Sequence, residues 1–182
     1  MIRVTVDSIR VSLLTQHRVV VLRETDSRRY LPIWIGPFEA DAIAMAIQGH
    51  EPQRPLTHDL LKSTITEMGG TVSHIFVNDI QENTFFARIV VEQGGQTIEV
   101  DARPSDAIAL AVRTDVPIYV ETHVLDQAGV YFDEDEQIDQ GPSPEDIPDA
   151  ESEPSDDSLS VFRNFINTLD LDDPEKGNSE KS

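Results

Sequence analysis

The sequence contains no cysteine and no long apolar run. Without cysteine, disulfide bonds and thiolate metal sites are excluded. No stretch approaches the roughly 20 apolar residues that a membrane helix requires. The N-terminal MIRVTVDSIRV alternates apolar and charged residues, which is unlike a signal or transit peptide. We therefore expect a soluble, cytoplasmic protein that does not contact a membrane.

Several signatures of catalysis and binding are also missing. The sequence has no glycine-rich phosphate loop, no zinc-ligand spacing and no nucleophile elbow. Positive charge is scarce: 14 Lys and Arg oppose 34 Asp and Glu, which gives a net charge of −20. Residues 1–132 contribute −6 of this charge and residues 133–182 contribute −14. The basic stripe that nucleic-acid-binding proteins usually carry is not visible in the sequence.

What the sequence does contain is a regular series of strand and helix signals. β-Branched residues dominate IRVTVDSIRVSLL, RVVVLRE and RYLPIWI, which polar turns separate, so we expect three strands within residues 2–35. Alanine-rich and capped segments predict helices, and short glycine or asparagine turns predict hairpins. The further expected elements are helices at 39–49, 57–68 and 104–114, and strands at 71–81, 84–93, 96–102 and 117–121.

One short string occurs twice. DAIAMAI at 41–47 returns as DAIALAV at 106–112, an offset of 65 residues. The same offset brings the strands and the helix of the second half close to those of the first, which indicates an internal repeat. Hairpin-linked strands form mainly antiparallel sheets with helices packed against them. We therefore predict an α+β domain over residues 1–133, built from two duplicated β-β-β-α units.

The composition changes after this domain. Residues 134–157 combine acidic residues, proline and serine, which predicts an acidic disordered linker. Within residues 158–182 we expect a short amphipathic helix and a disordered C-terminus, because one helical face carries Leu159, Phe162, Phe165, Ile166 and Leu169. So short a helix is marginal alone in water. We expect it to dock on its own domain or on a partner.

The stretch DARPSDAI at 101–108 leads into a predicted helix, whose first turn suits Pro104. Ser105 or Asp106 can cap this helix by accepting hydrogen bonds from its free N–H groups. The same geometry also suits function, because a helix N-terminus beside Arg103 can bind a phosphate. Asp101 and Asp106 can then hold a divalent ion that bridges to that phosphate. Both interpretations stay open at this point.

A similar stretch, RPLTHDLL at 54–61, places Arg54 and a proline just before another predicted helix. His58 beside Asp59 can supply a general base. Capping of the helix by Thr57 or Asp59 is the alternative.

Two further acidic residues, Glu39 and Asp41, stand at the start of the first predicted helix. Under the duplication, Asp41 is equivalent to Asp106, so the repeat would bring two helix starts together around a pseudo-twofold axis. Paired carboxylates in that place would suit a metal ion. Trp34 is interpreted as a packing or interface residue.

Four strings occur in a specific order: LPIWIG, RPLTHDLL, ENTFFA and DARPSDAIALAVR. Together they resemble the bifunctional nuclease family, also known as domain of unknown function 151, over about residues 1–133. The resemblance implies an α+β domain and a nuclease that acts on both DNA and RNA. The matching motifs carry residues at the positions of the family motifs, where the resemblance implies a function. These residues are Gly36, Glu39, His58, Asp59, Asp101, Arg103, Ser105 and Asp106. The acidic tail replaces the C-terminal helical motif of many relatives.

The motifs and this resemblance together predict a nuclease that binds nucleic acid as its substrate and partner. The expected catalytic residues are His58, Asp59, Arg103 and Asp106. Substrate binding is expected from Arg54, Arg103 and Ser105. A divalent metal, Mg²⁺ or Mn²⁺, is expected on Glu39, Asp41, Asp101 and Asp106, where it would offset the acidic charge of the domain. The alternatives are a non-enzymatic binding or regulatory module and, for assembly, a homo-oligomer.

Overall fold

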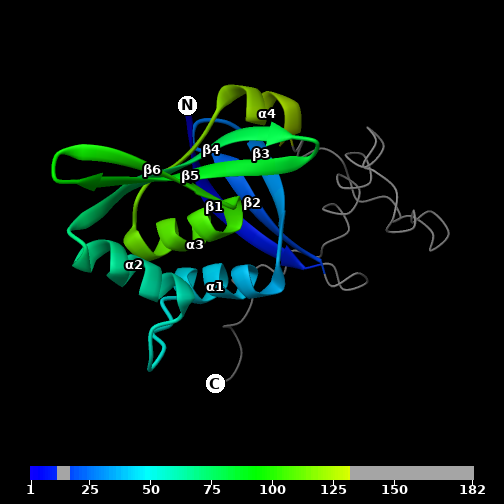
Figure 1. The fold of residues 1–182 in the computed structure, drawn as a ribbon. Helices are drawn as coiled ribbons and strands as arrows, with labels where there is room; N and C mark the ends of the chain where they lie inside the picture. The colour runs from blue at the N-terminus through cyan, green and yellow to red at the C-terminus, as the bar shows by residue number, and fades with distance from the viewer. Residues whose placement is uncertain (12–16, 132–182) are drawn as a thin grey trace, which may run out of the picture. The chain divides into compact units, whose positions relative to one another are not determined.

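The computed structural model of the protein describes residues 1–11 and 17–131, which form one eight-stranded sheet and four helices (Figure 1). The strand order is β6-β5-β4-β7-β1-β2-β3-β8. Every neighbouring pair is antiparallel except β4 and β7. The predicted α+β class is confirmed. The strands are β1 (Ile2–Val11), β2 (Arg18–Glu24), β3 (Arg29–Ile35), β4 (Gly70–Gln81), β5 (Thr84–Gln93), β6 (Gln96–Ala102), β7 (Ile118–Val120) and β8 (Val130–Tyr131); the helices are α1 (Pro37–Ile47), α2 (Thr57–Glu67), α3 (Pro104–Thr114) and α4 (Thr122–Ala128).

Two three-stranded meanders account for most of the sheet. β1, β2 and β3 are neighbours in chain order, and so are β4, β5 and β6. The first meander leads into α1 and the second into α3. β7 lies between the two meanders and pairs antiparallel with β1 and parallel with β4. β1 and β4 therefore run in opposite directions. Both predicted β-β-β-α units are therefore present, and β7 joins them into one sheet.

The hydrophobic core lies between the sheet and the helices. Alternate residues of each central strand point to the same face, and that face buries aliphatic side chains against α3. Full burial of such a side chain contributes about 1.5–3 kcal/mol. The largest fully buried residues of the core cluster include Leu22, Leu31, Ile43, Ile75, Ile108, Leu110 and Leu125.

The alanines of the repeated string have a packing role. Ala107, Ala109 and Ala111 are buried in α3, which packs against both α1 and α2. Ala40 and Ala42 are buried in α1. Small side chains let neighbouring elements approach closely at interior packing density. The repeated composition thus reflects two helices packed against each other and against a sheet.

The helix starts correct one predicted equivalence. α1 begins at Pro37 after Gly36, and α3 begins at Pro104 after Arg103. Counted from these prolines, the third residues are Glu39 and Asp106. Asp41 is the fifth residue of α1, so its predicted equivalence with Asp106 is wrong. The repeated string starts two residues deeper in α1 than in α3, and it repeats the helix composition without marking the helix start.

Two elements were not predicted from the sequence. The seven residues of α4 contribute the buried Val124 and Leu125 to the core and pack against β3 and β4. β8 then pairs with β3 through only two residues. Such short elements have little periodicity of their own. Their position is determined by tertiary packing.

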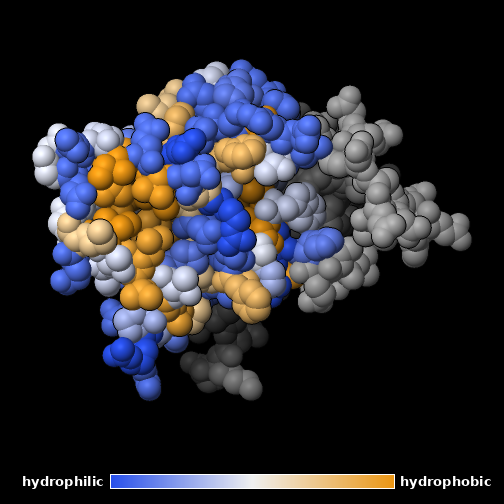
Figure 2. All heavy atoms as spheres, viewed as in Figure 1, coloured by the Kyte–Doolittle hydropathy of each residue, from blue (hydrophilic) through white to orange (hydrophobic). Residues whose placement is uncertain are grey.

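β6 lies at the edge of the described sheet and is hydrogen-bonded only to β5. Its Ile98 and Val100 are opposite the buried Val91 and Ile89, yet they remain 39% and 46% exposed. Figure 2 shows an apolar patch over the region of β6 and α2, and Leu60 of α2 is also exposed. The core face of the sheet therefore continues beyond the helices. The predicted homo-oligomer stays a prediction.

The predicted linker at 134–157 and the helix within 158–182 lie outside the described residues. The boundary at 133 therefore stays a prediction, as does docking of the tail helix. None of the helices within residues 1–11 and 17–131 is long and apolar enough to span a membrane.

Candidate active site

The candidate active site lies where three helices begin. α1, α2 and α3 each carry a carboxylate at their third residue, namely Glu39, Asp59 and Asp106. Acidic side chains in the first turn interact favourably with the positive end of the helix dipole. All three carboxylates bind an arginine that belongs to α3 or directly precedes it. Ion pairs thus join the start of α1 to the start of α3, through Glu39 and Arg103, and the start of α2 to the last turn of α3, through Asp59 and Arg113.

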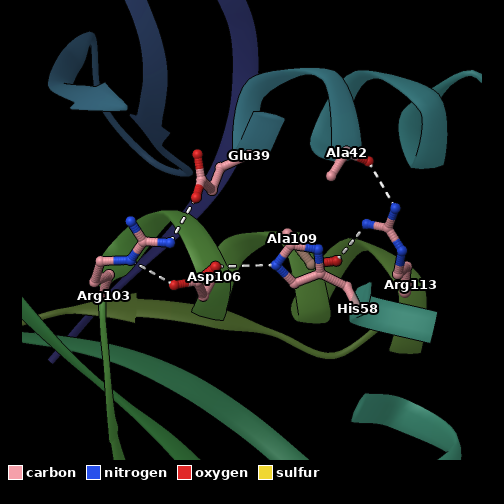
Figure 3. A network of polar contacts seen from close by, with 7 residues as sticks. All are labelled: Glu39, Ala42, His58, Arg103, Asp106, Ala109 and Arg113. Atoms are coloured by element: carbon pink, nitrogen blue, oxygen red, sulfur yellow. Dashed lines mark hydrogen bonds and ion pairs between the residues drawn. The ribbon is translucent and has the colours of Figure 1, made fainter. Parts of the chain in front are cut away.

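The exposed part of this arrangement centres on Arg103 (Figure 3). Its Nη2 atom donates to Glu39 Oε1 at 2.6 Å, and its Nε atom donates to Asp106 Oδ2 at 2.7 Å. The other Asp106 oxygen, Oδ1, lies 3.1 Å from His58 Nε2. The Arg103 side chain is 65% exposed, whereas His58 is buried. One carboxylate therefore bridges an accessible guanidinium and a buried imidazole.

The charges in this cluster support one another. Burial of the Asp106 carboxyl opposes its ionisation, but hydrogen bonds from Arg103 and His58 outweigh it and hold the pKa of Asp106 below its usual value. Hydrogen bonds to Asp106 and then to Glu39 raise the pKa of Arg103 above its usual value. Asp106 is therefore a carboxylate at neutral pH. Its Oδ1 atom can accept a hydrogen bond from the N–H of His58 and so orient the imidazole ring.

A second arginine, Arg113, forms the buried part of the arrangement. Its side chain is only 7% exposed, and its Nε atom donates to Asp59 Oδ1 at 2.8 Å. Its Nη1 and Nη2 atoms donate to the backbone oxygens of Ala109 at 2.8 Å and Ala42 at 2.9 Å (Figure 3). A buried arginine with such partners ties α1, α2 and α3 together. Sequence reasoning missed Arg113, although a charged residue that ends the apolar string DAIALAV was the available signal.

Asp59 has a structural part as well. Its Oδ2 atom accepts a hydrogen bond of 2.9 Å from the backbone N–H of Leu56, the N-cap of α2. Burial of the Asp59 carboxyl opposes ionisation, but this bond and the pairing with Arg113 hold its pKa below the usual value. The capping alternative for Asp59 is confirmed. Thr57 is the first helical residue and not the predicted N-cap.

The capping alternative for α3 has a different outcome. Arg103 is the N-cap residue, and its side chain makes no capping hydrogen bond. Both Asp106 oxygens are engaged by Arg103 and His58 instead of by free N–H groups of the helix. Ser105 is buried at 6% exposure, which leaves little of it for contact with a substrate. The side chain of Asp106 therefore points into the polar cluster.

The predicted metal ligands are only partly brought together. Glu39 and Asp106 converge on Arg103, but Asp41 lies 3.6 Å from Arg18 and Asp101 lies 3.5 Å from Arg88. Asp41 is turned away because it lies two residues beyond Glu39 on the helix, and Asp101 because it points to the opposite face of the sheet from Ala102. Within the described part of the chain, no three His, Asp or Glu side chains are grouped to hold a metal ion.

Gly36 has a steric role at this site. It is the N-cap of α1, and a Cβ atom built on it would overlap the carboxylate of Glu39. Its backbone conformation is ordinary extended backbone, with φ −68°. Glycine is therefore favoured here because a larger residue would displace the Glu39 carboxylate, and not because of φ. The exposed Arg54 lies in the segment between α1 and α2, outside the network of bonds just described.

The residues of this site lie in a segment that matches a known protein family. The sequence model of the bifunctional nuclease domain matches residues 20–133. The chain belongs to the bifunctional nuclease domain family. The matched range includes every residue of the polar cluster, from Glu39 to Arg113, which places the cluster inside the family domain.

Relatives of the family differ in how far they match. An uncharacterized protein of Mycobacterium tuberculosis is 41% identical over 171 residues, which cover 93% of this chain and 96% of that protein. Bifunctional nuclease 2 of Oryza sativa subsp. japonica is 30% identical over 118 residues, and bifunctional nuclease 1 of subsp. indica is 26% identical over 117. Each rice match covers 63% of this chain but only 36% and 35% of the rice proteins. The similarity to the named nucleases therefore extends over about a third of each rice protein.

Proposed function

We propose that the chain is a nuclease that hydrolyses phosphodiester bonds in DNA and RNA at the cluster of Glu39, His58, Arg103 and Asp106. Membership of the bifunctional nuclease domain family supports this activity. The observation that carries the assignment of the site is the pair of hydrogen bonds that the Asp106 carboxylate accepts, one from an exposed arginine and one from a histidine. These are the groups needed to hold a phosphate and to accept a proton.

Arg103 binds the phosphate in this proposal. Its side chain is 65% exposed, and its Nη1 atom makes no hydrogen bond to a described residue. A guanidinium fixed by two carboxylates is held in one orientation, so it stabilises developing charge without reorganising. The N-termini of α1 and α3 add N–H dipoles at the same place. Arg54 is a second phosphate contact of the proposal.

His58 supplies the base. Its Nε2 atom lies 3.1 Å from the Asp106 carboxylate, which can only accept, so Nε2 carries the proton in the neutral ring. The remaining nitrogen, Nδ1, makes no hydrogen bond to a described residue and can take a proton from the attacking water. Asp106 fixes the tautomer and stabilises the imidazolium that forms, as the aspartate of a catalytic triad does.

A divalent ion, Mg²⁺ or Mn²⁺, is part of the proposal. Glu39 and Asp106 would hold it, because their carboxylates come from two helix starts and both reach the guanidinium of Arg103. Such oxygen donors fit Mg²⁺, which commonly takes one or two carboxylates and completes its shell with water and substrate phosphate. When bound, the ion would neutralise charge that develops on the phosphoryl oxygens.

The test is cleavage of labelled DNA and RNA by purified protein free of host nuclease, with Mg²⁺ or Mn²⁺ and with chelator. Cleavage should depend on the ion, and His58→Gln should lower kcat by about 10²–10⁴. Lys62→Ala, which removes a cation from the exposed face of α2, is the matched control and should cleave at the wild-type rate. Absence of cleavage by the wild type would favour the non-enzymatic binding module, in which the ion pairs only join helices.

A further inference from the structure

A row of alternating arginine and aromatic side chains crosses the sheet on the face that points away from the core. Arg88, Phe76, Tyr119 and Arg3 are direct register partners on the adjacent strands β5, β4, β7 and β1. Their neighbours along the strands, such as Ile75, Val77, Ile118 and Val120, are buried in the core cluster. Because side chains alternate along a strand, these four residues, here called the arginine–aromatic row, share the opposite face.

Other residues extend this row into a surface. The ring of His74 lies edge-on to Tyr119, with centroids 5.5 Å apart. On the far side of β1, Thr5 pairs with Arg23 of β2, so Arg23 is the diagonal neighbour of Arg3 on the same face. Cross-strand diagonal neighbours lie about 7–8 Å apart. Phe76, Tyr119 and His74 are half-buried, and each ring retains accessible surface between the arginines.

Arg3 of β1 and Arg23 of β2 differ from most other arginines of the domain. Arg18, Arg29, Arg88, Arg103 and Arg113 each form an ion pair with a carboxylate. Arg3 and Arg23 are exposed and form no ion pair or hydrogen bond through their side chains with the described residues. Their charge is therefore available to a ligand. In a domain with a net charge of −6, this surface offers a polyanion two unneutralised positive charges on adjacent strands.

Acidic residues bound the surface on the other side. Glu92, Glu99 and Asp101 occupy the same face of β5 and β6, as their pairing with Thr97, Val90 and Arg88 shows. They repel phosphate from that edge. A polyanion would therefore lie over β4, β7, β1 and β2. In the other direction Val21 and Val19 follow Arg23 on the same face of β2 and are buried, at 3% and 0% exposed, so the accessible surface ends beside Arg23.

We propose that the arginine–aromatic row binds single-stranded nucleic acid, with bases stacked on Phe76 and Tyr119 and phosphates held by Arg3 and Arg23. This inference rests on the proposed nuclease function and specifies the form of its substrate. Aromatic rings on the face of a sheet can stack only on bases that are not already stacked in a duplex, and arginines beside them track the backbone. A double helix would meet the arginines but could not use the rings.

The binding experiment separates this surface from the catalytic cluster. The full-length protein is titrated into a fluorescently labelled single-stranded 20-mer in chelator, and anisotropy is followed at several salt concentrations. Arg3→Ala and Arg23→Ala should each weaken binding and reduce the slope of log K against log salt by about 0.7, the value for one phosphate contact on a single strand. Tyr119→Leu and Phe76→Leu should weaken binding about 5-fold to 100-fold with the slope unchanged. Thermal unfolding shows whether each variant is folded. If an aromatic variant does not fold, the variants of the more exposed Arg3 and Arg23 decide the test.

Lys62→Ala again serves as the control, because it removes one positive charge from α2 rather than from the sheet, and its binding should stay within about twofold of wild type. Equal losses for Lys62→Ala and Arg3→Ala, or a duplex of the same sequence competing better than the single strand, would overturn the proposal. So would a wild-type protein that binds no single strand. Arg103→Ala removes the phosphate contact of the active site, so it should weaken binding no more than Arg3→Ala does, whereas cleavage should be lost. If Arg103→Ala abolishes cleavage but Arg3→Ala and Arg23→Ala cleave at the wild-type rate, the proposed binding surface is contradicted and the proposed active site is still supported.

Discussion

The Nη2 atom of Arg103 lies 2.6 Å from Oε1 of Glu39, 64 positions away in the sequence. This ion pair joins the N-cap residue of α3 to the first turn of α1. It brings together two acidic helix starts that the repeated sequence suggested, although the partner of Asp106 is Glu39 rather than Asp41. The exposed Arg103 and the buried Arg113 then divide the polar cluster into a part accessible to substrate and a part that supports it.

The steric role of Gly36 gives a prediction about Glu39. Gly36→Ala should displace the Glu39 carboxylate, because the added Cβ atom would overlap it. Because the overlapped atoms end a flexible side chain, the variant should lose about 1 kcal/mol in unfolding free energy, the low end of the cost of overpacking. It should also lose cleavage as Glu39→Ala does. Urea denaturation and cleavage assays measure both effects.

A double mutant provides the control. In Gly36→Ala/Glu39→Ala the overlap is absent, so the double mutant should be more stable than the sum of the single changes by about 1 kcal/mol. Additive losses would show that the two residues do not meet as described.

Arg113 should matter for stability more than Arg103 does. Arg113→Met removes the charged partner of Asp59, whose side chain is 29% exposed, and the donor to the backbone oxygens of Ala42 and Ala109. The free energy of unfolding should therefore fall by about 2–3 kcal/mol. Arg103→Ala, which removes an exposed side chain, should lower the free energy of unfolding by less than about 1 kcal/mol. Equilibrium unfolding in urea, with unchanged m-values, measures both. A similar loss in the two variants would contradict the division of the cluster.

The depressed pKa of Asp106 predicts how stability depends on pH. Its pKa is lower in the folded protein than the ordinary value near 4 in the unfolded chain. The stability that this carboxylate contributes is therefore complete above about pH 4 and is lost as pH falls through the folded pKa. Wild type should exceed Asp106→Asn by about 2 kcal/mol at neutral pH, as expected for hydrogen bonds to a charged group.

Chemical denaturation from pH 7 down to pH 3 measures this difference. The gap between wild type and Asp106→Asn should narrow in the acidic range. A gap that stays constant throughout would show that ionisation of Asp106 does not support the fold.

Some of this architecture can be read from the sequence, and the reasons are local. β-Branched strands separated by two-residue turns specify antiparallel meanders, and proline after Gly36 or Arg103 specifies a helix start. By contrast, the sequence could not place Arg113 on Ala42 or insert β7 between β1 and β4, because these contacts arise from tertiary packing. The unpaired state of Arg3 and Arg23 was hidden for the same reason. Net charge counts residues but does not tell which of them neutralise one another.

The measurement that tests the central claim most directly is kcat/KM for cleavage by Arg103→Ala, made beside Lys62→Ala at the same metal concentration. Removing a preorganised contact to developing phosphate charge costs about 2.7–4 kcal/mol in the transition state. We predict that Arg103→Ala, folded and close to wild type in stability, is about 10²–10³ slower than wild type, whereas Lys62→Ala is unaffected. Cleavage by Arg103→Ala at the wild-type rate would contradict the assignment of this cluster as the active site.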